Sequence, residues 1–152
     1  MHIAIGNDHA GLDRKQVIIA FLQSKGHTVD DCGTNSSDSC DYPDYAHKVC
    51  TSIQNKSAEQ GILICGTGIG MSISANKYIG IRAALVQDIE SAKATREHNN
   101  SNILCLGARV IDTQTTLDIL NIWLETSFEG GRHQRRIDKI SQIEQDNYKK
   151  SL

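Results

Sequence analysis

A cysteine followed directly by alternating glycines is the part of this sequence best suited to chemistry. The stretch reads Cys65-Gly66-Thr67-Gly68-Ile69-Gly70 and follows the apolar run 61–64. The apolar run predicts a buried strand that ends at Cys65, and residues 69–77 predict a helix that begins beneath the glycines. A glycine loop at a helix N-terminus presents free backbone N–H groups, which bind anions and favour a thiolate. The pattern is therefore suited to removing a proton next to a carbonyl group and stabilising the resulting enediolate.

Two other interpretations of this stretch stay open from the residues alone. Cys65 could be a small buried side chain, and the glycines could serve only a tight turn and close helix packing. The loop could also belong to a dinucleotide-binding fold, with Asp88 after the next strand as the ribose ligand. The spacing disfavours that second interpretation, because the fingerprint G-x-G-x-x-G requires glycine at position 71, where the chain has Met71.

Composition excludes several classes of function. The 152 residues are enough for one domain with a proper core, and 16 basic residues against 18 acidic ones argue against a general nucleic-acid binder. No apolar segment approaches the roughly 18 residues of a membrane span, and the first residues do not resemble a signal peptide. The five cysteines are odd in number and include no C-x-x-C pair. This disfavours a disulfide framework and a zinc site, so we expect no metal and a reducing, cytoplasmic environment.

Strands and helices alternate along the chain. Apolar runs and periodicity predict strands at 2–5, 28–31, 61–65, 82–86 and 103–106, and helices at 13–25, 45–55, 69–77, 90–98, 115–125 and 134–148. The alternation indicates an α/β protein, a three-layer α/β/α sandwich around a five-stranded, parallel, Rossmann-like sheet. Residues 1–126 would form this domain, and residues 127–152 a C-terminal helical arm of the same unit. Ile137, Ile140 and Ile143 form one apolar stripe on that arm.

Ligands in such folds bind at the carboxyl ends of the strands, where Cys65 is expected. Asp8 and His9 follow the first strand there, and Tyr42 follows the second. Each also has a structural explanation: Asp8 as a helix cap, His9 as a simple loop residue, and Tyr42 as an aromatic ring packed over its loop.

His98 creates a difficulty, because it lies between the fourth helix and the fifth strand and so belongs to the amino edge of the sheet. It could simply complement the dipole of its helix. If it is catalytic, a second subunit would have to bring it to Cys65. Arg132 and Arg136 are four residues apart and share a helical face that could clamp a phosphate or merely be solvated, whereas Arg135 points elsewhere.

Several separated motifs, in order, resemble the type B ribose-5-phosphate isomerase family, which includes galactose-6-phosphate isomerase subunits. The resemblance runs essentially from end to end, and it rests on residues 6–11, 41–43, 64–72, 75–77, 98–99, 107–110 and 129–133. One branch of the family has a cysteine base before the glycine loop, and another has a glutamate just after it. Cys65 and Met71 occupy these two positions, so the chain resembles the cysteine branch.

The resemblance implies conversion of ribose 5-phosphate to ribulose 5-phosphate without a metal or organic cofactor. It implies that Cys65 is the base, that the N–H groups of residues 66–70 stabilise the enediolate, and that His98 helps to open the sugar ring. It further implies that Asp8 and Tyr42 contact the sugar hydroxyl groups and that Asn99 supports the loop region. The phosphate would be bound by His9, Arg109, Arg132 and Arg136.

The expected assembly is a homodimer with shared active sites, or a dimer of such dimers. Other functions are an isomerase of a six-carbon sugar phosphate (allose or galactose 6-phosphate), a nucleotide-binding regulatory module, and a non-catalytic partner subunit. The last would be expected to lack part of the set of site residues, and this chain carries all of it.

Overall fold

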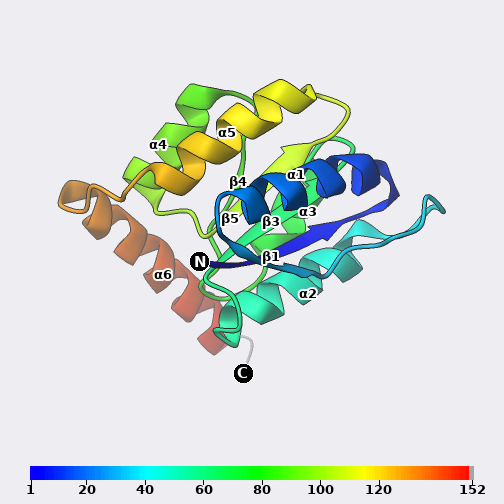
Figure 1. The fold of residues 1–152 in the computed structure, drawn as a ribbon. Helices are drawn as coiled ribbons and strands as arrows, with labels where there is room; N and C mark the ends of the chain where they lie inside the picture. The colour runs from blue at the N-terminus through cyan, green and yellow to red at the C-terminus, as the bar shows by residue number, and fades with distance from the viewer. Residues whose placement is uncertain (151–152) are drawn as a thin grey trace.

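A five-stranded sheet lies at the centre of the computed structural model, which describes residues 1–150 (Figure 1). The strands are β1 (His2–Asn7), β2 (Thr28–Asp31), β3 (Gln60–Cys65), β4 (Ala83–Leu85) and β5 (Ile103–Gly107). The helices are the 3-10 turn η1 (His9–Gly11), α1 (Leu12–Ser24), α2 (Tyr42–Gln54), α3 (Ile69–Ala75), α4 (Ile89–Asn99), α5 (Thr113–Glu125) and α6 (Arg132–Lys150).

All strand pairs are parallel, and the order across the sheet is β2-β1-β3-β5-β4. Side chains of one strand alternate between the two faces: Ile3 and Ile5 pack with α1, α4 and α5, whereas Ala4 packs with α2 and α3. This confirms the predicted three-layer sandwich. In this order β1, β3 and β5 are neighbours, so the loops that follow them converge at one edge.

The start of α2 differs from the expectation. The sequence predicts a helix from residue 45, just after Pro43, but α2 begins at Tyr42 with the proline in its first turn. Proline is well tolerated there because the first N–H groups of a helix have no partner within it. Tyr42 is therefore fixed at a helix end and is not a free loop residue.

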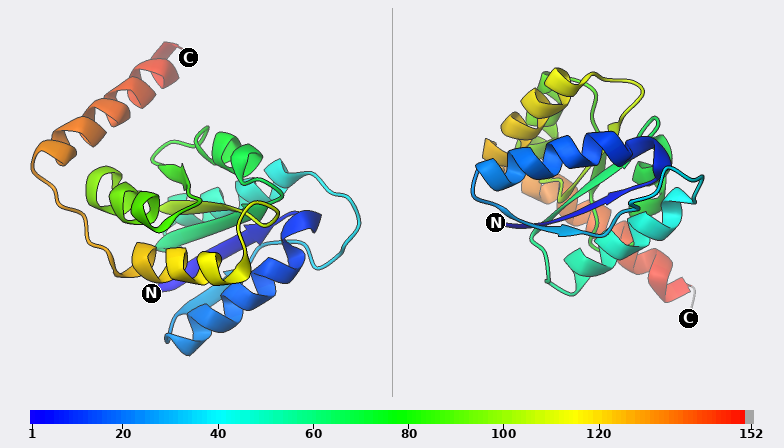
Figure 2. Two further views of the ribbon diagram at one scale, coloured as in Figure 1. Left: turned by 90° about the horizontal axis from the view of Figure 1, so that it is seen from above. Right: turned by 45° about the vertical axis from the view of Figure 1, so that its right-hand side comes forward.

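Helix α6 extends away from the body of the protein (Figure 2). A segment without helix or strand precedes it, as expected for residues 127–131. Of the predicted isoleucine stripe, Ile137 is buried, but Ile140 and Ile143 are 47% and 62% exposed. Within residues 1–150, no helix combines the length and apolar character needed to cross a membrane.

Candidate active site

Three loops are joined at the carboxyl edge of the sheet. The N–H of Asp8, after β1, donates to the carbonyl of Ile64 over 3.2 Å. The N–H of Arg109, after β5, donates to the carbonyl of Gly66 over 3.0 Å. The end of β3 and the loop after it therefore bond through the main chain to residues on both sides. Asp8, Cys65 and Arg109 are thereby brought to one place.

The Cys65 thiol lies at the base of the glycine loop and is 5% exposed. Its Sγ accepts a hydrogen bond from the backbone N–H of Gly68 over 3.1 Å. Helix α3 begins at Ile69, directly after Gly68, so the sulfur lies close to a helix N-terminus. Both features stabilise negative charge on sulfur. The arrangement thus suits a thiol that loses its proton and acts as a base.

Two glycines allow the loop its close approach to the sheet. Gly68 has φ +77°, and a Cβ there would lie 2.6 Å from Cδ1 of Leu85. A Cβ on Gly107 would lie 2.7 Å from the carbonyl atoms of Thr67. Because the second clash involves backbone, larger residues would displace the loop and the N–H that reaches Cys65.

Tyr42 and Arg109 border the glycine loop from other elements. A Cβ on Gly70 would lie 2.5 Å from Cζ of Tyr42, so the phenol ring packs directly against this glycine. A Cβ on Gly66 would lie 3.4 Å from Nη1 of Arg109. A phenol hydroxyl and a guanidinium are donors suited to sugar hydroxyls and to phosphate, respectively.

Asp8 and His9 are both held by backbone groups. The Oδ1 of Asp8 accepts from the N–H of Ala10 over 2.9 Å, so this carboxylate caps η1. The predicted role of Asp8 as a helix cap is therefore confirmed, and it uses one of the two carboxylate oxygens. His9 Nδ1 lies 3.3 Å from the donating N–H of Cys40. A neutral His9 ring accordingly carries its proton on Nε2.

His98 lies at the amino edge, in the last turn of α4 and before the start of β5. Its ring stacks on that of His133, with centroids 4.3 Å apart and an interplanar angle of 14°. The two edges are joined by β3, whose six residues span roughly 16 Å. The position of His98 at the edge opposite to Cys65 confirms what chain direction predicts.

His133 is 4% exposed, and its Nε2 lies 3.3 Å from a carboxylate oxygen of Glu129. Burial lowers the pKa of His133, and the nearby His98, Arg132 and Arg136 lower it further, while Glu129 opposes them. Protonation of this ring, which stacks on His98, is thus disfavoured.

Arg132 and Arg136 both reach His133, as expected for residues on one helical face. Nε of Arg132 lies 3.4 Å from Nε2 of His133, and Nη1 of Arg136 lies 3.4 Å from Nδ1. Both arginines are exposed. Asn99 is exposed next to His98, and its carbonyl accepts from Nε of Arg82 over 3.0 Å. Cationic and polar groups therefore gather at this edge.

Among residues 1–150, one group of side chains brings several metal-ligand types together. The ligand atoms of His98, Glu129 and His133 lie within 4.8 Å of one another. A metal lies about 2 Å from each imidazole nitrogen and in the plane of each ring. Two nearly parallel rings with centroids 4.3 Å apart cannot both meet this requirement as they stand. The two adjacent arginines also disfavour a cation here.

Sequence reasoning missed two features of the site region. His133 and Glu129 entered only as part of a motif, although their spacing of four residues could have indicated contact. Lys15 is fully buried beside the loop that leads to Tyr42, and nothing in its sequence context distinguishes it from a surface lysine.

Comparison with known proteins identifies the family. A family model described as Ribose/Galactose Isomerase matches residues 3–140. Ribose-5-phosphate isomerase B of Escherichia coli is 46% identical over 94% of this chain and 96% of its own.

Solved structures agree with this match. A ribose-5-phosphate isomerase B from Clostridium thermocellum superposes with a TM-score of 0.95 at 46% identity, covering 97% of this chain and 99% of its own. The enzyme from Mycoplasma genitalium, solved with bound ribulose-5-phosphate, gives a TM-score of 0.91 at 44% identity, with 95% and 96% covered. The chain described here belongs to the ribose/galactose isomerase family.

Proposed function

We propose that the protein is a cofactor-independent aldose–ketose isomerase that interconverts D-ribose 5-phosphate and D-ribulose 5-phosphate. The observation that carries the proposal is the hydrogen bond from the Gly68 N–H to the Cys65 sulfur, within a loop suited to binding anions. The high similarity to the Mycoplasma genitalium enzyme with bound ribulose-5-phosphate supports this substrate.

In the proposed reaction, the Cys65 thiolate removes the proton from C2 of the open-chain aldose. The electron pair of the broken C2–H bond forms the C1=C2 double bond, and negative charge develops on O1. The hydroxyl proton on O2 moves to O1, C2 becomes the carbonyl carbon, and the thiol returns its proton to C1. The N–H groups of residues 66–70 stabilise the enediolate, and such donors are typically worth about 3 kcal/mol each.

His98 has a separate task, because sugar phosphates of this kind are largely closed rings. Ring opening moves a proton from the C1 hydroxyl towards the ring oxygen, for which an imidazole is suited. Cys65 and His98 of one chain lie at opposite sheet edges. We therefore propose a two-fold dimer in which His98 of the partner subunit acts beside Cys65.

The shape of the chain supports this assembly. Helix α6 extends from the body and exposes Ile140 and Ile143. A hollow of about 280 Å³ lies beside it and is lined in part by Ile140, Ile81 and Asn99. A second subunit packed at this surface would bury the isoleucines and lie next to His98. Two such dimers could assemble further.

The remaining site residues are proposed to bind the substrate. Asp8 and Tyr42 contact sugar hydroxyls, and Asn99 supports the region around His98. The phosphate is bound by residues from both edges: His9, Arg109, Arg132 and Arg136. We also propose a cytoplasmic location, because all five cysteines are free thiols, and free thiols persist in a reducing environment.

A six-carbon sugar phosphate is the second candidate substrate, favoured by the matching family's description as Ribose/Galactose Isomerase. The test is a coupled assay of the purified protein on ribose 5-phosphate, allose 6-phosphate and galactose 6-phosphate. We expect the highest kcat/KM for ribose 5-phosphate, unchanged after dialysis against EDTA. Preference for a six-carbon substrate would replace the proposed one, and activity that is restored only by a divalent ion would contradict a metal-free reaction.

A further inference from the structure

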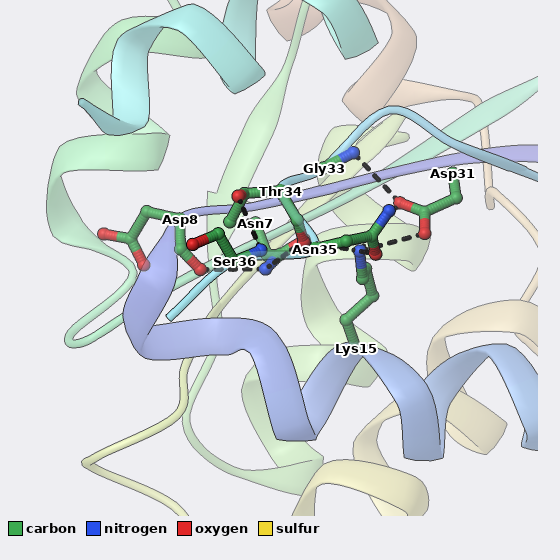
Figure 3. Close-up of polar contacts among 8 residues, drawn as sticks. All are labelled: Asn7, Asp8, Lys15, Asp31, Gly33, Thr34, Asn35 and Ser36. Carbon is green, nitrogen blue, oxygen red and sulfur yellow. Dashed lines mark hydrogen bonds and ion pairs between the residues drawn. The ribbon is translucent and has the colours of Figure 1, made fainter. Parts of the chain in front are cut away.

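Lys15 is a charged side chain with no exposed surface, located on α1 beneath the loop that joins β2 to α2 (Figure 3). Its Nζ lies 2.9 Å from a carboxylate oxygen of Asp31. It also donates to the carbonyl of Thr34 over 2.7 Å and to Oδ1 of Asn35 over 2.8 Å. The ammonium thus meets one acceptor at the end of β2 and two in the first residues of the loop that follows, residues 32–41.

These acceptors connect Lys15 to the end of β1. The carbonyl of Thr34 also lies 3.4 Å from Nδ2 of Asn7, which donates to the carbonyl of Asp8 over 2.8 Å. A Cβ on Gly33 would lie only 1.8 Å from Oδ1 of Asn7, so the loop packs directly on this asparagine. The start of loop 32–41 is thereby bonded to the residue before Asp8 and to Asp8 itself.

The far end of the loop reaches two more proposed substrate-binding residues. The N–H of Cys40 bonds to His9, and the chain then enters α2 at Tyr42, whose ring packs against Gly70. Between its ends the loop extends outward from the carboxyl edge (Figure 1). Asp8, His9 and Tyr42 are therefore all attached to one loop, and Lys15 anchors its start.

The Lys15 ammonium is fully buried, whereas its partner Asp31 keeps 31% of its side chain exposed. Burying a charge is costly, and an ion pair often contributes no net stability over apolar side chains of similar volume. What an ammonium with three charge-assisted hydrogen bonds supplies is a defined geometry for its acceptors. Here the acceptors belong to the chain that leads into loop 32–41, so the ammonium defines the course of this loop towards the proposed sugar-binding residues.

We propose that Lys15 is a positioning residue for substrate binding, acting through loop 32–41 on Asp8, His9 and Tyr42. The inference rests on the proposed function. Lys15 does not contact substrate in this mechanism. Its removal should therefore weaken substrate binding much more than it slows the chemical step at Cys65.

The test compares Lys15→Met with Ile18→Ala, a substitution in the same helix at a buried position that faces the sheet. Lys15→Met should raise KM for ribose 5-phosphate roughly tenfold and change kcat less than about threefold. It should also speed amide hydrogen exchange at Thr34 and Cys40. Ile18→Ala should lower the thermal midpoint but leave KM and exchange in the loop unchanged.

A milder pair of variants is available if Lys15→Met does not fold. Asn35→Ala removes one exposed acceptor of the ammonium and should raise KM about two- to threefold, whereas Ser37→Ala in the same loop should not. Unchanged KM and exchange in Lys15→Met, or equal KM effects in both members of either pair, would overturn the proposal. A wild-type protein that isomerises no sugar phosphate would instead contradict the proposed function, and slower or unchanged exchange at Thr34 in Lys15→Met would still overturn the anchoring role.

Discussion

At the carboxyl edge of the sheet the loop around Cys65 is held by main-chain hydrogen bonds, whereas at the amino edge His98 and His133 meet through their side chains. Backbone bonds join Asp8 to Ile64 and Arg109 to Gly66, and a backbone N–H reaches the Cys65 sulfur. At the other edge, a ring stack joins His98 to His133. The two groups of residues are ordered by different means.

The difference indicates a division of labour. Backbone N–H groups in a fixed loop provide uncharged donors whose positions do not depend on pH, which suits an enediolate. Imidazoles and guanidinium groups at the amino edge can transfer a proton or neutralise a phosphate. In one chain, His98 and the two arginines beside His133 are separated from the Cys65 loop by the length of β3.

The largest expected effect comes from removing the base. Cys65→Ala should lower kcat at least roughly a thousandfold while the protein still binds ribose 5-phosphate. Cys50→Ala is the control, because burial raises the pKa of Cys50 to about 12, so this thiol stays protonated near neutral pH and cannot accept a proton. Iodoacetate should inactivate the wild type, and substrate should protect it. Near-normal turnover by Cys65→Ala would contradict the mechanism.

The second prediction tests whether the two edges meet between subunits. Cys65→Ala and His98→Ala proteins, each inactive alone, should regain activity when they are unfolded and refolded together. With random pairing, half of the dimers contain one chain of each variant, and each of these mixed dimers has one intact site out of two. Recovery should therefore approach about a quarter of wild-type activity. Mixed dimers that form but stay inactive would place both residues in the site of one chain.

The third prediction concerns charge at the amino edge. Arg132→Ala and Arg136→Ala should each raise KM for ribose 5-phosphate tenfold or more, since each removes a charge-assisted bond worth roughly 1.5–3 kcal/mol. Arg135→Ala removes the same charge from an exposed neighbouring position and should have little effect. Equal increases in all three variants would indicate a general charge effect and not a phosphate clamp.

Sequence alone predicted the carboxyl edge better than the amino edge. Glycines, a strand end and a helix start are local signals, so the loop around Cys65 and the parallel sheet could be inferred from spacing. The stack of His98 on His133 joins α4 to α6 across a segment without regular structure, and no local pattern encodes such a contact. The anchoring of loop 32–41 by Lys15 depends equally on tertiary packing.

The smallest expected effect is on stability at low pH, and it tests whether the amino edge is built around a neutral imidazole. The pKa of His133 is lowered from 6.5 by burial, with His98, Arg132 and Arg136 adding to the effect. At a pH between the lowered pKa of the folded chain and the pKa of the unfolded chain, the unfolded chain binds a proton at this position and the folded chain does not. The stability that this group contributes is therefore fully present above pH 6.5 and is lost as the pH falls towards the folded value.

Phenylalanine at this position keeps a flat ring against His98 but cannot titrate. His133→Phe should accordingly lose less stability than the wild type when the pH is lowered from about 7.5 to about 5.5, measured as the urea midpoint at one fixed protein concentration. The fixed concentration matters because dissociation of a dimer would add its own pH dependence. An equal loss in both proteins would mean that the ring titrates alike in the folded and unfolded chains. In that case the side chains around His133 would not keep it neutral, and the contrast between the two edges would rest on geometry alone.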